Sequence, residues 1–290
     1  MEIFVVWPAA LFIAVGLLGL IVGSFLNVVA YRLPIMLERA WREQCAELGG
    51  ESAVVGEERR RFDLWWPPST CPHCGARVAV QHNIPILSYL WLRGRCAGCG
   101  SKIAVRYPIV ETSAAVLGLV VAWVLGPTWQ TVAGLGFAWT LLALTLIDVD
   151  RQLLPDSMTL PLLWAGILLA AVPGTPVFVD LRSSVIGAAA GYLSLWTVYQ
   201  LFKLVTGKEG MGYGDFKLLA AIGAWVGWQM LPLVILLSAA VGTVVGLSLI
   251  LFGGRSRHVP IPFGPYLAAA GWLALLWGER LTALYGALVV

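Results

Sequence analysis

The sequence predicts an all-α membrane protein that crosses the bilayer about eight times. Of its 290 residues, 59% are hydrophobic. Only 12% are charged, against about 25% in soluble domains. Apolar runs of roughly 18 residues recur along the chain, which is the length that a membrane-spanning helix requires. Tryptophans near the ends of these runs are typical of the aromatic belts at the two membrane surfaces.

The first apolar run is expected to stay in the protein as a membrane helix. Glu2, rather than a positive charge, precedes it, and no convincing small-residue cleavage site follows, so a cleaved signal peptide is not indicated. The expected spans are 8–31, 109–126, 130–147, 157–173, 183–204, 215–231, 234–252 and 262–278. The predicted regions are a first transmembrane helix (1–31), a cytoplasmic module (32–107) and a membrane-embedded domain (108–290).

The positive charges predict the orientation of the chain in the membrane. If the polar segment 32–106 is cytoplasmic, all of the 19 Lys and Arg residues except Arg182 and Arg280 fall on the cytoplasmic side. Positive charge favours the cytoplasmic side of short loops. Eight spans then place both termini on the opposite side.

Two CxxC pairs in the polar segment predict a metal site. The four residues are Cys71, Cys74, Cys96 and Cys99. CxxC on a tight turn aims two thiolates at one point, and two such pairs complete a tetrahedral zinc site. Gly75 and Gly100, each directly after a pair, suit such turns. Disulfides are disfavoured in the cytoplasm, and free thiols are the remaining alternative. Because four thiolates leave no open coordination position, we expect a structural zinc ion.

Several acidic residues follow the apolar run that ends near Leu146. A carboxylate costs roughly 2.5–3.5 kcal/mol at the membrane centre and less near its edge, so such a residue usually has a function or a partner. Asp148 and Asp150 lie about 200° apart around a helix, so the two cannot face one site. Their alternative role is to cap a helix end beside Arg151, and Asp156 is expected to start the next helix.

Asp215 follows three glycines, Gly210, Gly212 and Gly214. Glycine adopts backbone conformations denied to other residues, so the chain could lie close to a substrate while the carboxylate points at it. The alternative is a helix-capping aspartate behind a flexible linker. Two carboxyl groups in a partly dry site share a proton and provide general acid–base catalysis. From the residues alone, it stays open whether Asp148 meets Asp215.

Motifs along nearly the whole chain resemble the type IV prepilin peptidases, a family of intramembrane GxGD aspartyl proteases that are also N-methyltransferases. The matching segments are GSFLNVVAYRLP (23–34), both CxxC pairs, NIPILSYLWLRGRC (83–96), RYPIVE (106–111), the aspartate pattern at Asp148, Pro155 and Asp156, GYGD (212–215) and PIPFGPYLA (260–268). GxGD alone is a weak signal, whereas all of these motifs in order are highly specific.

The resemblance implies that Asp148 and Asp215 are the catalytic pair and that Gly212 and Gly214 form the supporting loop. The family pattern places the first catalytic aspartate seven residues before the proline, which selects Asp148 over Asp150. The implied substrates are type IV prepilins and the pseudopilins of type II secretion, whose short leader stays in the cytoplasm. The implied location is the bacterial inner membrane, with periplasmic termini and an active site that faces the cytoplasm. Membrane lipid is an expected partner of the chain.

The family's second activity methylates the new N-terminal amine with S-adenosylmethionine. The residues themselves carry no glycine fingerprint of a nucleotide-binding fold, so this activity rests on the resemblance. Gly94 and the four cysteines are the matching candidates, and the rest of the cofactor site is unassigned. No nucleic-acid partner is expected, and the oligomeric state is not indicated.

Three other functions are compatible with parts of the sequence. The chain could be a peptidase without methylation. It could be a proton-coupled transporter, which suits carboxylates and broken helices, although these acidic residues gather at one membrane face and no inverted repeat is visible. A zinc-ribbon scaffold without chemistry leaves the two-aspartate pattern unexplained.

Overall fold

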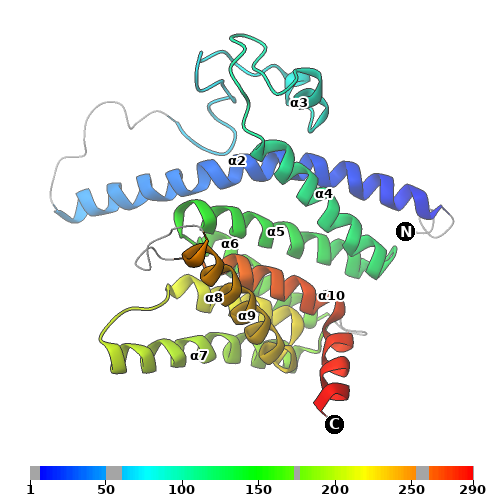
Figure 1. Cartoon of the computed structure of the whole chain (residues 1–290), viewed down its shortest axis with the longest axis vertical. Helices are drawn as coiled ribbons and strands as arrows, with labels where there is room; N and C mark the ends of the chain where they lie inside the picture. Colours follow the sequence, from blue (N-terminus) through cyan, green and yellow to red (C-terminus); the bar gives the residue numbers. More distant parts are fainter. Residues whose placement is uncertain (1–6, 50–60, 173–176, 253–260, 290) are drawn as a thin grey trace. The chain divides into compact units, whose positions relative to one another are not determined.

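Helices dominate the computed structural model, which describes residues 7–49, 61–172, 177–252 and 261–289 (Figure 1). Within these ranges no β-strand occurs, and the only sheet-like pairs are the isolated bridges Thr70–Arg77 and Arg95–Lys102. The predicted all-α class is therefore confirmed. The chain divides into two compact units, Met1–Trp123 and Val124–Val290. The division into three regions proposed from the sequence stays a prediction.

Each of the eight predicted spans coincides with one α-helix of the structure, although the helices differ in length. In the first unit these are α2 (Pro8–Gly49) and α4 (Arg106–Leu125), with the short η1 (Val80–Asn83) and α3 (Leu87–Trp91) between them. In the second unit the helices are α5 (Trp129–Arg151), α6 (Asp156–Ala170), α7 (Leu181–Thr206), α8 (Tyr213–Val226), η2 (Trp228–Met230), α9 (Leu231–Leu251) and α10 (Gly264–Val289).

Among the described residues, five helical segments are long and apolar enough to cross a membrane. They are α2, α4, α5, α7 and the continuous segment Trp228–Leu251. By contrast, α6 has 15 residues and α8 has 14, so each is only about 21–23 Å long against a hydrocarbon core of about 30 Å. The chain is thus a polytopic helical membrane protein, while the number of crossings and the orientation stay predictions.

The first helix is longer than the sequence analysis expects. The expected span ends at residue 31, but α2 continues without a break to Gly49 and includes Pro34. The added part alternates apolar residues with Glu and Arg at helical spacing, which favours a helix outside the membrane. Its last described residue is Gly49. The charged residues after position 31 therefore mark the expected end of the apolar span, but not the end of the helix.

The two long helices of the first unit pack through small residues. A side chain on Gly19 would lie 2.6 Å from the Ala115 backbone, and one on Gly23 would lie 2.6 Å from the Glu111 backbone. The Asn27 amide donates to the Gly23 carbonyl at 3.2 Å and to the Tyr107 carbonyl at 3.4 Å. Small residues and interhelical hydrogen bonds are the usual means of helix association in membranes. Asn27 therefore links α2 to α4 by a hydrogen bond.

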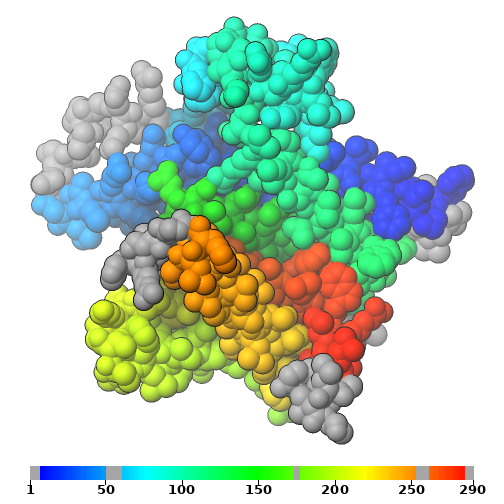
Figure 2. Space-filling model, in the orientation of Figure 1, coloured from blue at the N-terminus to red at the C-terminus, as the bar shows by residue number. Residues whose placement is uncertain are grey.

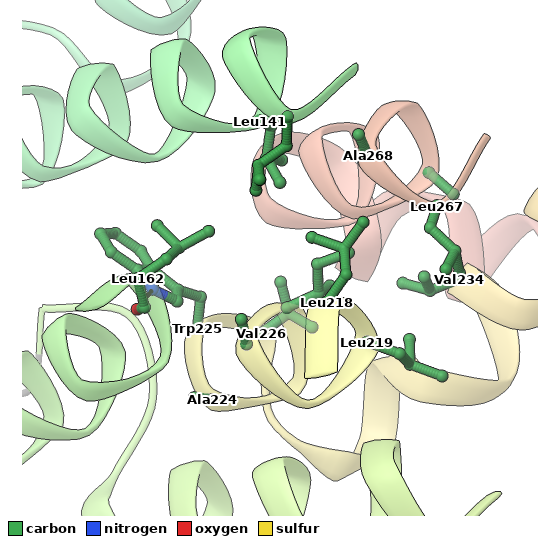
Figure 3. Close-up of a cluster of buried hydrophobic side chains, with 14 of the residues drawn as sticks. Leu141, Leu162, Leu218, Leu219, Ala224, Trp225, Val226, Val234, Leu267 and Ala268 are labelled. Atoms are coloured by element: carbon green, nitrogen blue, oxygen red, sulfur yellow. Dashed lines mark hydrogen bonds between the residues drawn. The ribbon is translucent and has the colours of Figure 1, made fainter. Parts of the chain in front are cut away.

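The core of the second unit is built around α8. Every residue from Asp215 to Val226 except Lys217 is buried. Figure 3 shows the α8 side chains Leu218 and Trp225 facing Leu141 of α5, Leu162 of α6 and Leu267 of α10. A helix that is apolar on all sides needs such complete burial. The first turn of α8, with Asp215, is consequently held by several neighbouring helices.

Glycines let α7 lie directly against α8. A side chain on Gly187 would lie 2.2 Å from the Gly223 carbonyl oxygen, and one on Gly191 would lie 2.6 Å from the Leu219 carbonyl oxygen. The Ser184 hydroxyl donates to the Ala224 carbonyl at 2.7 Å across the same interface. Close backbone contact and such bonds supply the attraction between helices where lipid removes the hydrophobic driving force.

Candidate active site and four-cysteine centre

Asp148 lies in the last turn of α5, with its side chain turned into the helix bundle. Only 5% of the residue is exposed, whereas Asp150, two residues later, is exposed. The two side chains therefore lie on opposite faces of α5, as their spacing in the sequence predicts. The structure therefore separates the two aspartates as expected, although the assignment of Asp148 to catalysis is a proposal.

Asp215 lies in the first turn of α8 and is 8% exposed. The glycines before it act differently from what the sequence analysis expects. Gly212 has ordinary extended angles (φ −80°, ψ 147°), and Gly214 also lies outside the left-handed region. A side chain on Gly214 would instead lie 2.8 Å from the Leu154 Cβ atom. The expected unusual conformation is thus wrong here, and Gly214 is required for close packing.

The two buried carboxyl groups interact with one another. Asp148 and Asp215 lie near enough for their charges to interact, although the residues belong to different helices. Backbone groups contact the pair as well. The N–H of Gly264 at the start of α10 donates to Asp148 Oδ2 at 3.0 Å, and the backbone of Gly212 contacts the Asp215 carboxyl group. A pair of buried carboxyl groups with few other partners can hold one proton between them, which is the arrangement used for general acid–base catalysis.

An ion pair joins two helices near the aspartates. Lys217 Nζ lies 2.7 Å from both carboxylate oxygens of Asp156, which links the first turn of α8 to the first residue of α6. Asp156 therefore starts a helix, as predicted. Lys217, two residues after Asp215, is thus paired with Asp156.

The four cysteines form two matching turns in the segment between α2 and α4, whose atoms appear as a cyan lobe in Figure 2. Gly75 N–H donates to the Cys71 carbonyl, and Gly100 N–H donates to the Cys96 carbonyl, both at 2.9 Å. Both glycines have left-handed φ angles, +69° and +72°. Glycine accepts this conformation without strain, so the local role expected for both residues is confirmed.

The geometry of the four sulfurs fits one metal ion. The Sγ atoms of Cys71, Cys74, Cys96 and Cys99 all lie within 4.8 Å of one another. The Cys71 and Cys99 sulfurs are 3.9 Å apart, close to the roughly 3.8 Å that a tetrahedral ion with 2.3 Å metal–sulfur bonds requires. Backbone N–H groups of Cys74 and His73, with the Ser101 hydroxyl, lower the pKa of Cys71 to about 6. The cluster can therefore bind a metal ion.

Gly94 has a structural explanation of its own. Its φ angle is +68°, its N–H donates to the Tyr89 carbonyl at 2.8 Å, and its carbonyl accepts from Ile103 at 2.8 Å. A side chain there would lie 2.9 Å from the Tyr89 hydroxyl. The turn geometry therefore explains why this residue is a glycine. A role of Gly94 in binding the methyl donor stays a prediction.

Two polar residues within the motifs that carry the resemblance, Arg32 and Glu111, organise the first unit. The Arg32 guanidinium is buried and donates to the carbonyls of Asp63 at 3.0 Å and Pro67 at 2.6 Å. The Glu111 carboxylate, on α4, accepts from the Ile86 N–H at 2.7 Å. Both side chains attach the cysteine-bearing segment to a membrane helix. Long-range contacts of this kind leave no local sequence signal.

Comparisons with known proteins agree with this arrangement. A model of the bacterial peptidase A24 N-terminal domain matches residues 17–125, and a model of the type IV leader peptidase family matches residues 135–247. A prepilin leader peptidase/N-methyltransferase of Aeromonas salmonicida is 54% identical over 96% of this chain and 94% of its own length. Proteins with the same name from Pseudomonas putida (54%, 95% and 94%) and Pseudomonas aeruginosa (53%, 96% and 94%) are equally similar.

The helical fold, the buried aspartates and these matches define a membrane-embedded enzyme of the peptidase class. More particularly, the chain belongs to the type IV leader peptidase family. The resemblance found in the sequence is thereby confirmed. No solved structure gives a significant match to the chain.

Proposed function

We propose that this chain cleaves the leader from type IV prepilins and pseudopilins and then methylates the new N-terminal amine. The observation that carries the proposal is the meeting of two buried carboxyl groups, from Asp148 and Asp215, at the ends of two membrane-associated helices. Relatives that share half of their residues with this chain are named for both activities.

Asp148 and Asp215 together provide what peptide hydrolysis needs. One carboxyl group, when ionised, takes a proton from water as the water oxygen bonds to the peptide carbonyl carbon. The other, when protonated, gives its proton to the carbonyl oxygen. The C–N bond then breaks as a proton reaches the leaving nitrogen. Because both aspartates lie at helix ends, they suit a peptide bond at the membrane edge, where a polar leader meets an apolar helix.

The four-cysteine cluster is proposed to hold zinc. Zinc prefers four tetrahedral thiolates, and a site closed by four protein ligands has no position for substrate. Zinc would therefore contribute to the stability of the module rather than to peptide cleavage. S-adenosylmethionine is the proposed methyl donor, since the relatives' name includes an N-methyltransferase.

The proposed orientation places both termini in the periplasm and the aspartates toward the cytoplasm. The distribution of positive charge supports it. Single cysteines introduced near Gly126 and Val177 should react with a periplasmic reagent, and one near Lys208 should react only from the cytoplasm. Cytoplasmic labelling at either of the first two positions would contradict the eight-span arrangement.

The direct test is to incubate the full chain in detergent with a prepilin and S-adenosylmethionine and to measure the product by mass spectrometry. We expect a product that has lost its leader and gained one methyl group. An unchanged prepilin that binds tightly would favour a scaffold, and an unchanged prepilin that does not bind would favour the transporter alternative.

A further inference from the structure

The first residue of α10 makes a contact that the two-aspartate scheme does not include. The Gly264 N–H donates to Asp148 Oδ2 although 116 residues separate them in the chain. The first N–H groups of a helix have no acceptor within that helix. Pro265 has no N–H, and the Tyr266 N–H donates to the Phe263 carbonyl. Gly264 therefore offers the free donor of this turn, and the buried carboxyl group accepts it.

A side chain at this position would displace the Asp148 carboxyl group. A Cβ atom on Gly264 would lie 2.7 Å from Asp148 Oδ2 and 3.3 Å from Leu154 Cδ2. The φ angle of Gly264 is not left-handed, so the requirement concerns space rather than conformation. Leu154 also fills the space beside Gly214, the residue that precedes Asp215. The starts of α10 and α8 thus both pack against the Leu154 side chain.

The hydrogen bond distinguishes the two carboxyl groups. An N–H donor interacts more strongly with an ionised acceptor than with a neutral one, so the Gly264 N–H favours an ionised Asp148. The partial charge of helix ends does not separate the pair in this way, because Asp215 itself lies in the first turn of α8. A buried N–H group without an acceptor is costly, so the contact satisfies both partners. Asp148 and Asp215 therefore do not have equivalent surroundings.

We propose that Gly264 is a positioning residue for peptide cleavage, whose N–H holds Asp148 in place as the ionised member of the pair. This inference rests on the proposed function. Asp148 then takes the proton from water as one O–H bond breaks and the water oxygen bonds to the carbonyl carbon. Asp215 carries the second proton and gives it to the carbonyl oxygen.

The charged groups around Asp148 are few. Among the described residues, Asp215 of α8 is a titratable group that interacts with Asp148. Asp156 of α6 and Lys217 of α8 pair with each other, and Asp150 on the same helix is exposed. A change in the pH dependence of cleavage after substitution at Gly264 would therefore reflect the aspartate pair.

The test compares Gly264→Ala with Gly278→Ala in the full chain in detergent. Both positions lie on α10, and a Cβ atom on Gly278 would also be tightly placed, 2.8 Å from Met230 Sδ, but that side chain is flexible. Gly264→Ala should lower kcat for a prepilin by about 10²-fold, since displacing a catalytic group by about 1 Å has this effect. KM should change little, and Gly278→Ala should cleave normally.

The pH profile separates positioning from simple loss of packing. Without its donor, Asp148 takes up a proton more readily, so the acidic limb of the kcat profile should move to higher pH in Gly264→Ala. An unchanged kcat, or a lower kcat with an unmoved acidic limb, would overturn the proposal. Loss of cleavage in Asp148→Asn tests the proposed function separately, because it does not involve Gly264.

A double variant covers the case in which Gly264→Ala does not fold. Replacing Asp148 by Ala removes the oxygen that the new Cβ atom would meet. Gly264→Ala/Asp148→Ala should then regain the thermal stability of Asp148→Ala alone. If it stays unfolded, the crowding at Gly264 does not arise from the aspartate, and the proposal is overturned.

Discussion

The aspartate pair and the cysteine cluster are positioned by different forces. Asp148 and Asp215 are buried, and each is held by helices that are distant in sequence. The cysteines occupy two local turns, and Cys74 and Cys99 are exposed. The first site therefore depends on the packing of the whole helix bundle, whereas the second depends on short-range hydrogen bonds and on the metal ion that we propose for it. Damage to one site is expected to leave the other largely intact.

The largest expected effect is on cleavage by the aspartate variants. Asp148→Asn and Asp215→Asn should each reduce the cleavage rate at least about 10²-fold, because the amide cannot exchange the proton. The double variant should lose little more than either single one, since the two groups act as a unit. The measurement is the rate of prepilin cleavage in detergent.

Asp150→Asn and Asp156→Asn are the matched controls. Asp150 is exposed, and Asp156 is paired with Lys217 at the surface, so both variants should keep most of the activity. Normal cleavage by Asp148→Asn together with loss in Asp150→Asn would show that the wrong aspartate of α5 has been chosen.

The next effect is on the cysteine cluster. Cys71→Ser/Cys96→Ser should remove the metal, which elemental analysis of the wild type should detect at about one zinc per chain. The module should become less stable, and methylation should fall more than cleavage, because the aspartates are held by other contacts. Zinc content equal to that of the wild type would eliminate the four-thiolate site.

The smallest expected effect concerns helix packing in the second unit. Gly187→Ala would place a Cβ atom against the Gly223 carbonyl, so the variant should lose about 1–3 kcal/mol of stability through overpacking. Gly136→Ala is the control, since a Cβ atom there meets no atom within 4 Å. Thermal unfolding in detergent compares the two. Equal melting temperatures would contradict the close approach of α7 and α8.

Local patterns in the sequence were sufficient to predict the eight helices and both cysteine turns. The length of the apolar runs predicts the helices, and CxxC followed by glycine predicts the cysteine turns. The extension of α2 to Gly49 was missed because the charged residues after 31 were taken as the start of a separate module. The contact between Gly264 and Asp148 could not be predicted, since it depends on how α5 and α10 pack. For the same reason, Gly214 proved to be a packing residue rather than a flexible one.

The most direct test of the account follows cleavage and methylation in one variant. Asp215→Asn is given either an intact prepilin or a pilin already freed of its leader, with S-adenosylmethionine, and the products are weighed by mass spectrometry. Because methylation needs a free amine and a methyl donor rather than the shared proton, we expect no cleavage of the prepilin and normal methylation of the cleaved pilin. Normal cleavage by Asp215→Asn would contradict the central claim that the buried aspartate pair hydrolyses the leader peptide bond.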